Sequence, residues 1–392
     1  MTNDGNTCPV CASQQVLIFL ERTGVPVHQN MLYPTKQAAI STNRGDLRLA
    51  VCRDCGFVFN CSFDQTLLLY GKDYDNTQTY SSTFDGYLSA LVSYLLDVKK
   101  LHASRILEVG CGKGYFLEQL VNNDLGNVGF GFDPSYDGPE TTAGGRITFF
   151  KRFYGSEDSE FQPDAVICRH VIKHVPDPLG LLATINKSLI GSSRGSLFIE
   201  TPCVEWILDG VVFWDFFYEH CSYFSETSLT TALTRAGFVV ENMFHTFGGQ
   251  YLWAEARPRT TNISNFSKSG SIAMKAKHYA QVENGFIQKI ANSIKKYANL
   301  EKVAIWGAGA KGVTILNLVD PEANLVECVV DLNPHKHNCF IPGTGHPIVP
   351  YLTLPHLGVH IAFVMNPNYL EENLKLIEES GINIRLTTWE KA

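Results

Sequence analysis

Short apolar runs alternate with longer amphipathic stretches along most of the chain, and this alternation predicts two α/β units. The first set of runs is Arg105–Val109, Val128–Phe132, Ala165–Cys168 and Ser196–Ile199. The second set is Lys302–Trp306, Leu325–Val330, His360–Met365 and Asn383–Thr387. Strands that alternate with helical stretches in this way are typical of a parallel sheet covered by helices.

Two segments carry apolar residues at helical spacing, residues 84–101 and Ile272–Tyr297. We expect the second to be one long amphipathic helix that bridges the two α/β units. A polar, turn-rich stretch separates two cysteine pairs near the N-terminus. The pattern therefore predicts an α/β protein in three parts: a small N-terminal module (1–75), a first α/β domain (76–260) and a second α/β domain (261–392).

Composition narrows the class of protein. The 392 residues suffice for two or three domains, and 45% hydrophobic with 18% charged residues excludes a disordered chain. No apolar run approaches the about 18 residues of a membrane span, and the polar start lacks the order of a signal peptide. We therefore expect a cytoplasmic protein with no membrane partner.

The net charge of −7 and the absence of Lys/Arg runs argue against nucleic acid as a partner. We expect a monomer that acts on a small molecule.

Four of the 11 cysteines form two Cys-x-x-Cys pairs, Cys8 with Cys11 and Cys52 with Cys55. Two such pairs can supply four thiolates to one tetrahedral Zn²⁺, and a site with no open position is structural. The alternative is two unrelated pairs, one of them redox-active. The odd number of cysteines argues against a disulfide framework.

A glycine-rich turn follows the first predicted strand, with Gly110, Gly112 and Gly114 after Glu108. Small residues here let a ligand approach the backbone at a helix N-terminus, and Asp133, at the end of the next strand, can accept both hydroxyls of a ribose. A nicotinamide-binding loop is the alternative. With Glu108 before the first glycine and Asp133 after the next strand, the segment resembles motifs I and II of class I S-adenosylmethionine methyltransferases. A Glu in this position is a trait of those methyltransferases and argues against the nicotinamide-binding loop.

That resemblance implies a Rossmann-like methyltransferase domain and further contacts to the cofactor. Pro134 and Phe153 would lie near its adenosine, and Arg169 and His170 would lie along its methionine part.

An aromatic stretch, residues 213–225, contains the dipeptide Glu219-His220. Burial and a neighbouring carboxylate shift the pKa of an imidazole in opposite directions, so we expect the pKa of His220 to stay near neutral pH, as suits a general base. The alternative is a solvated Glu-His pair at the edge of an aromatic core.

The order of zinc module, methyltransferase domain, Tyr-Glu-His-x-x-Tyr-Phe-Ser stretch and C-terminal α/β unit resembles the nucleotide-sugar C-methyltransferases of branched deoxysugar biosynthesis. The resemblance implies that His220 is the base, assisted by Glu219, Tyr80 and His174. It places a Tyr three residues before the His, where this chain has Phe217. Tyr218 follows one position later and is a predicted substrate contact.

A second glycine-rich turn, residues 307–312, follows the strand Lys302–Trp306 and precedes Asp331 at dinucleotide-binding spacing. A bound nicotinamide is one interpretation. The resemblance implies instead that this Rossmann-like unit binds the nucleotide sugar, with Lys311, Asn333 and Asn366 as contacts.

The sequence thus predicts S-adenosylmethionine-dependent methylation at C3 of a nucleotide-linked (dTDP or GDP) 4-keto-6-deoxy sugar. Two alternatives stay open. One is a zinc-module methyltransferase acting on an oxygen or nitrogen of RNA or a small molecule, and the other is a non-catalytic protein that binds nucleotide sugars.

Overall fold

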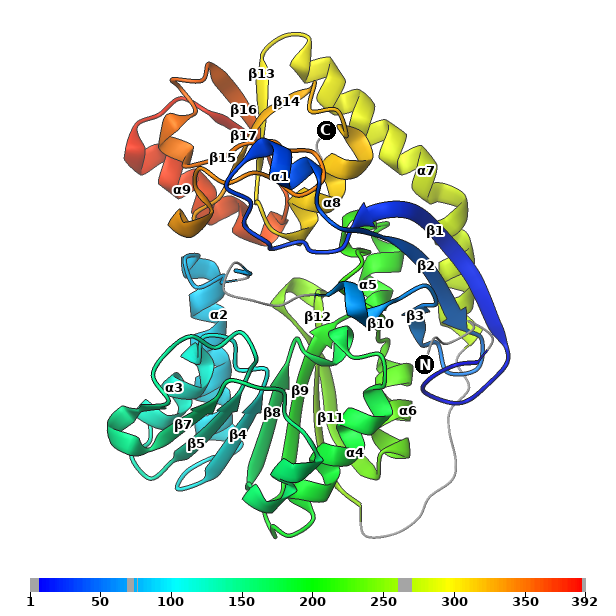
Figure 1. Ribbon diagram of the computed structural model, residues 1–392, viewed down its shortest axis with the longest axis vertical. Helices are drawn as coiled ribbons and strands as arrows, with labels where there is room; N and C mark the ends of the chain where they lie inside the picture. The colour runs from blue at the N-terminus through cyan, green and yellow to red at the C-terminus, as the bar shows by residue number, and fades with distance from the viewer. Residues whose placement is uncertain (1–6, 69–73, 76, 260–269, 390–392) are drawn as a thin grey trace.

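The computed structural model describes residues 7–68, 74–75, 77–259 and 270–389. Within these residues the strands form three sheets of four, eight and five strands. The eight-stranded and five-stranded sheets belong to two α/β units, and the four-stranded sheet and helix α7 (Gly270–Ala298) run along one side of both (Figure 1).

The four-stranded sheet is built from the N-terminal segment and from one strand far away in the sequence. Its order is β1-β2-β3-β10, and its paired strands are antiparallel. The bounds are β1 Val16–Pro26, β2 Arg44–Cys52, β3 Val58–Asn60 and β10 Ser222–Tyr223, with α1 (Lys36–Ile40) between β1 and β2. Strand β10 begins two residues after His220, so the predicted base closely precedes a strand of the N-terminal sheet.

The interpretation of residues 12–50 as a polar, turn-rich stretch was wrong, because β1 and β2 form a long hairpin there. Alternation of apolar and polar residues is weak in β1. Phe19 packs its ring against Phe216 and Tyr279 and is followed by the apolar Leu20, whereas the next two residues, Glu21 and Arg22, are both charged. A strand whose partners come from distant elements carries little periodic signal of its own.

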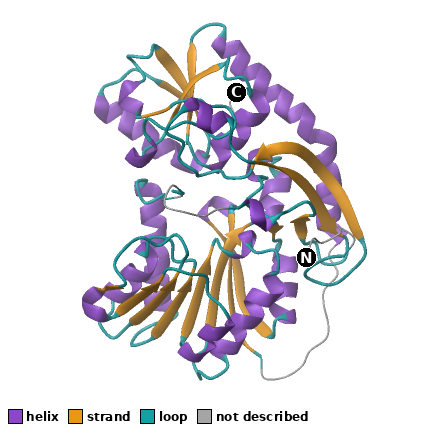
Figure 2. Ribbon diagram, viewed as in Figure 1, coloured by secondary structure: helices purple, strands orange, loops and turns teal. Residues whose placement is uncertain are grey.

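The eight-stranded sheet confirms the first predicted α/β unit. Its order is β11-β12-β9-β8-β4-β5-β7-β6; β12 is antiparallel to both neighbours, and the strands from β9 to β7 are parallel. The strands are β4 Arg105–Val109, β5 Val128–Phe132, β6 Thr141–Thr142, β7 Ile147–Phe150, β8 Ala165–Arg169, β9 Ser196–Pro202, β11 Phe238–Thr246 and β12 Tyr251–Pro258. Helices lie on both sides of this sheet (Figure 2). They are α2 Ser82–Ser93, α3 Tyr115–Asn122, α4 Pro178–Leu189 and α6 Glu226–Arg235. The short helix α5 (Val204–Asp209) packs against α7 instead.

The five-stranded sheet confirms the second predicted α/β unit. It is parallel throughout, in the order β15-β14-β13-β16-β17. The strands are β13 Lys302–Trp306, β14 Val326–Val330, β15 Ile348–Val349, β16 Val359–Val364 and β17 Arg385–Thr387, and the helices are α8 Ala310–Val319 and α9 Leu370–Ser380. The 29-residue helix α7 confirms the predicted long helix.

Both parallel sheets reverse their strand order at one point, between β4 and β8 in the first and between β13 and β16 in the second. Ligands of open α/β sheets bind outside the carboxyl ends of the strands at such a point. The glycine-rich turns after β4 and β13 lie at these two places.

One buried apolar cluster joins the N-terminal sheet to the second α/β unit. It contains Leu49 of β2, Phe216 of the aromatic stretch, Tyr279 of α7 and Ile305 of β13, all under 2% exposed. The three parts therefore do not each enclose a separate core. Among the described residues, no helix is long and apolar enough to cross a membrane.

Candidate active site

The four predicted zinc ligands lie together. Their Sγ atoms all lie within 4.8 Å of one another, with Cys8 at 3.6 Å from Cys55 and Cys11 at 3.4 Å from Cys52. All four thiols are free of disulfides. Four sulfurs around one Zn²⁺ at about 2.3 Å require separations of about 3.8 Å, so this cluster fits a tetrahedral ion.

The first glycine-rich turn is tied to Asp133. The amides of Gly110 and Cys111 donate to the carbonyl of Phe132, and the Gly112 amide donates to Asp133 Oδ2 at 2.9 Å. Gly114 caps α3 with φ +86°. A Cβ on Gly110 would lie 2.1 Å from Val171 Cγ2, so the turn fits against the segment after β8 only without a side chain.

A buried polar group lies behind this turn. Arg169 Nε donates to Glu200 Oε2 at 2.8 Å, and its guanidinium lies over the Phe116 ring. Burial raises the pKa of Glu108 to about 7. His170 Nε2 lies 3.2 Å from Glu200 Oε2, whereas Glu108 Oε2, Arg169 Nη2 and His170 Nδ1 are buried without a hydrogen-bond partner in the structure. Unpaired buried polar atoms are costly, so their grouping beside a glycine-rich turn fits a polar ligand that pairs with them.

Not every predicted cofactor contact joins this group. Phe153 is 66% exposed, next to Arg152, which binds Asp158 with both terminal nitrogens. Pro134 follows Asp133 at the end of β5.

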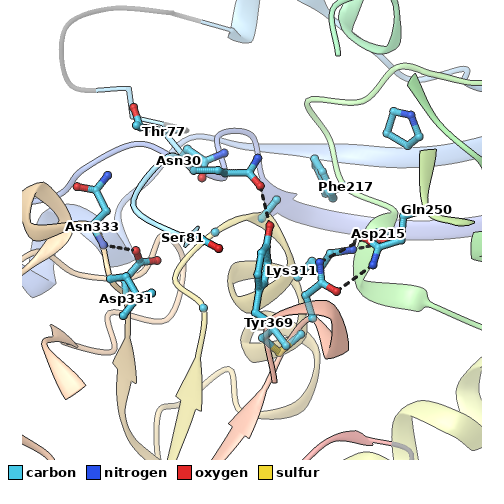
Figure 3. A pocket seen from close by; sticks show the side chains of 18 of the residues that line it. Asn30, Thr77, Ser81, Asp215, Phe217, Gln250, Lys311, Asp331, Asn333 and Tyr369 are labelled. Carbon is cyan, nitrogen blue, oxygen red and sulfur yellow. Dashed lines mark hydrogen bonds and ion pairs between the residues drawn. The ribbon is translucent and has the colours of Figure 1, made fainter. Parts of the chain in front are cut away.

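A cavity of about 270 Å³ lies between the two α/β units. The first unit contributes Lys173, His174, Pro202, Gln250 and Tyr251. The second contributes residues after β13, β14 and β16, among them Gly307, Lys311, Asp331 and Asn366. In Figure 3, Asp331 and Asn333 lie on the opposite side of this cavity from Asp215, Phe217 and Gln250. The cavity therefore has room for an elongated ligand that contacts both units.

Glu219 and His220 both line the cavity and are 1% and 6% exposed. Their side chains have different surroundings. Glu219 accepts hydrogen bonds from the Gln29 amide at 2.8 Å and the Tyr74 hydroxyl at 2.9 Å, and burial raises its pKa to about 7. His220 packs against the Phe217 ring, and its buried Nδ1 has no hydrogen-bond partner in the structure.

Burial, together with the charge of Lys173, holds the pKa of His220 well below its usual value. The expectation that the neighbouring carboxylate would offset burial does not hold, because the Glu219 carboxyl is bound by the N-terminal segment. The imidazole is therefore neutral at pH 7, the protonation state that a general base requires.

His174 lies beside His220, with their ring centroids 5.0 Å apart. Its Nδ1 is 2.8 Å from the carbonyl oxygen of Glu219, which requires the proton to be on Nδ1. Burial lowers the pKa of His174 to about 3. Two neutral imidazoles thus lie side by side at one end of the cavity.

Lys311, at the start of α8, forms an ion pair with Asp215 (Figure 3). Asp331 accepts the amides of Ala308 and Asn333, each at 2.9 Å, so it holds the second glycine-rich turn as Asp133 holds the first.

Two side-chain amides of the second unit bind other parts of the chain. Asn333 Nδ2 donates to Asp75, and Asn366 Oδ1 accepts from Gln250 Nε2 at 2.9 Å. The predicted contacts Lys311, Asn333 and Asn366 all line the cavity.

Tyr80 lines the cavity and is 44% exposed. The next residues fasten α2 to the second unit, because Ser81 Oγ and the Ser82 amide both donate to Glu372 of α9 at 2.6 Å. Tyr218 does not line the cavity: its ring lies against Gly45 and Phe63, and its hydroxyl accepts from the Asp64 amide at 2.8 Å. The structure brings Phe217 to the cavity instead.

Sequence reasoning missed the cavity residues Asn30, Tyr74, Lys173 and Asp215. Asn30 and Tyr74 belong to the segment interpreted as part of a separate metal module. The one signal in the sequence that could have identified Lys173 as a cavity residue is its position between His170 and His174.

Comparison with known families and structures gives two separate matches. Residues 80–242 match the family described as a methyltransferase domain, and residues 269–381 match the family described as a C-methyltransferase C-terminal domain. A search among curated proteins found no match. The eight-stranded sheet is accordingly the predicted class I Rossmann-like methyltransferase fold.

Solved methyltransferase structures resemble part of the chain. One is the N,N-8-amino-8-demethyl-D-riboflavin dimethyltransferase of Streptomyces davawensis (18% identity, 44% of this chain and 54% of that one, TM-score 0.34). Another is 1,6-didemethyltoxoflavin-N1-methyltransferase of Burkholderia thailandensis (18%, 45% and 80%, TM-score 0.35). A third is magnesium protoporphyrin IX methyltransferase of Synechocystis (17%, 45% and 84%, TM-score 0.34). This chain thus spans about half of the first of these proteins.

Proposed function

We propose that this S-adenosylmethionine-dependent methyltransferase, with its C-methyltransferase C-terminal domain, methylates C3 of a nucleotide-linked 4-keto-6-deoxy sugar. One observation carries the proposal. The cavity between the two α/β units contains a buried, neutral His220, and glycine-rich turns follow the strands β4 and β13. A carbon acid needs a base of this kind, and a nucleotide sugar is long enough to reach from the second unit to that base.

The cofactor would be held by the turn at Gly110–Gly114, by Asp133 at its ribose, and by the unpaired polar atoms of Glu108 and His170. When bound, S-adenosylmethionine supplies an electrophilic methyl group on a sulfonium. Arg169, held by its hydrogen bond to Glu200, would keep this end of the cofactor site polar. Burial alone would raise the pKa of Glu200, but the Arg169 guanidinium lowers it to about 2, so the pair stays ionised.

The protein's own residues would carry out the proton transfer. A 4-keto group acidifies the hydrogen on C3, and His220 removes that proton. His174 is held in one tautomer by the Glu219 carbonyl, and Phe217 covers the ring of the base. A positioned base contributes ~10²–10⁴-fold to the rate. The four-cysteine cluster would hold a structural Zn²⁺ and take no part in this step.

Incubation with labelled S-adenosylmethionine and a panel of dTDP-, GDP- and CDP-linked 4-keto-6-deoxy sugars tests the proposal. We expect one methyl group on C3 of one of these sugars, located by mass spectrometry and NMR. A methyl group on oxygen or nitrogen would contradict it. Tight sugar binding without turnover would favour the non-catalytic alternative.

His220→Ala tests the assignment of the base. We expect turnover to fall by at least ~10²-fold while S-adenosylmethionine binding, measured by calorimetry, stays unchanged. His245→Ala is the matched control, because His245 is exposed and lies outside the cavity. A near-normal rate in the His220 variant would show that another group is the base.

A further inference from the structure

Lys173 lines the cavity, but it has no role in the reaction proposed above. It is half-buried and lies in the short turn Ile172–His174 that follows β8, directly before His174 in the sequence. Its side chain lines the same cavity as His220.

The other charged groups of the cavity already have partners. Lys311 pairs with Asp215, and Lys336 lies 3.8 Å from Asp331 and donates to the Ala308 carbonyl. Glu219 accepts from Gln29 and Tyr74, and Glu372 accepts from Ser81 and Ser82.

Lys173 has no such partner. Within the described part of the chain, no carboxylate lies at ion-pair distance from its ammonium and no acceptor receives its hydrogen bond. Burial lowers the pKa of Lys173 to about 8, although Glu219 and Asp215 act in the opposite direction. A half-buried cation without a counter-charge destabilises the folded protein. Such a cation is typical of a functional site, where it pairs with an anion that binds or forms during the reaction.

The position of Lys173 relative to the base indicates which anion this is. The Lys173 carbonyl accepts from the Sγ of Cys221, the residue after His220, at 3.7 Å, and the ring of His174, the residue after Lys173, lies 5.0 Å from that of His220. The Lys173 charge accordingly weakens His220 as a base, second only to burial. A weak base can remove a proton from carbon only where the resulting negative charge is stabilised. In the proposed reaction that charge develops on the oxygen of C4, the carbon bonded to the C3 that loses its proton.

We propose, on the basis of the function proposed above, that Lys173 is a further catalytic residue whose ammonium donates a hydrogen bond to the C4 oxygen and stabilises the enolate. The C3–H bond breaks, its proton goes to His220, and its electron pair forms the C3=C4 bond while the carbonyl π pair moves to oxygen. C3 then attacks the methyl carbon, the S–C bond breaks with its pair on sulfur, and the C4=O bond forms again.

Exchange of the C3 hydrogen in D₂O isolates the first step. It is measured by NMR on the 4-keto sugar with S-adenosylhomocysteine bound, so that no methyl transfer follows. In Lys173→Met we expect exchange at saturating sugar, and kcat, to fall by ~10²–10³-fold, the effect of removing one oxyanion donor. The Kd for the sugar and for S-adenosylhomocysteine should change less than about threefold.

Lys375→Met is the matched control, because Lys375 is 75% exposed on α9 and lies outside the cavity. Lys173→Gln, which keeps a neutral donor, is the second variant should the methionine variant not fold, and melting temperatures check both. Near-normal exchange at saturation would overturn the inference, and so would a loss that appears only in the Kd for the sugar, because Lys173 would then only bind it. If the wild-type protein neither exchanges nor methylates any sugar of the panel, the proposed function itself fails.

Discussion

Glu219 and His220 are neighbours in the sequence, but their side chains have separate roles. The carboxyl group is bound by Gln29 and Tyr74, whereas the imidazole lies against Phe217 at the cavity. Adjacent residues outside a helix point in different directions, so the dipeptide says little about which groups meet. The sequence therefore identified the two residues but not the environment of either one.

The pKa of His220 predicts the acid side of the pH–rate profile. Because burial holds this pKa well below 6.5, the neutral base persists as the pH falls through 6.5. Burial raises the pKa of Glu108 and Glu219 to about 7, so these carboxyls titrate between pH 7 and 6 whereas His220 does not. We therefore expect kcat/KM, which reports the free enzyme, to stay nearly constant from pH 7 down to about 6 in Glu108→Gln/Glu219→Gln protein and to fall only at lower pH. An acid limb with its midpoint near 6.5 in that variant would mean that the base is a solvated imidazole.

At the scale of elements, strands that are continuous apolar runs could be predicted, and strands of mixed apolar and polar residues could not. The predicted strand Lys302–Trp306 coincides with β13, because buried parallel strands are continuous apolar runs. The β1–β2 hairpin was missed because its partners, the aromatic stretch and α7, lie 194 and 261 positions away at the contacts of Arg22.

Arg22 of β1 is the contact that joins these distant elements. Its guanidinium donates to the carbonyls of Phe216 and Phe213 and pairs with Glu283 of α7, and both charged side chains are 8% exposed. We expect Arg22→Met to lower the free energy of unfolding by about 3–5 kcal/mol, because the Glu283 carboxylate stays buried without its partner. Urea unfolding followed by tryptophan fluorescence measures this loss.

Arg48→Met is the control on the same sheet, because Arg48 pairs with Glu21 at 2.8 Å and both side chains are largely exposed. Its cost should not exceed about 1 kcal/mol. Equal losses in the two variants would show that burial of the Arg22 pair has no special effect.

At the scale of the whole molecule, the order of parts along the chain was predictable and their contacts were not. The sequence suggested a metal module that ends near residue 75, separate from the site. The structure instead brings Asn30 and Tyr74 to the cavity and Gln29 to Glu219. No local pattern encodes such contacts, since each depends on how the two α/β units face each other.

Removal of the metal tests this arrangement. The cysteine cluster fixes β2 beside β3, and β3 pairs with β10, which begins two residues after His220. We therefore expect a strong zinc chelator to lower the melting temperature and to abolish turnover, with both restored by added Zn²⁺. Cys52→Ser should lose the metal, measured by atomic absorption, whereas Cys61→Ser should keep it because Cys61 lies outside the cluster. Full activity in the metal-free protein would contradict this dependence.

The pairing of β3 with β10 also limits how this chain can be recombined. Val58 and Phe59 face Tyr223 and Ser222 across an antiparallel ladder, so the N-terminal segment and the aromatic stretch share one register. A chimaera that exchanges residues 1–75 with those of a relative must therefore carry residues 213–225 with them. The two segments form one structural unit although they are far apart in the sequence. Substitutions in one of them therefore have to remain compatible with the other.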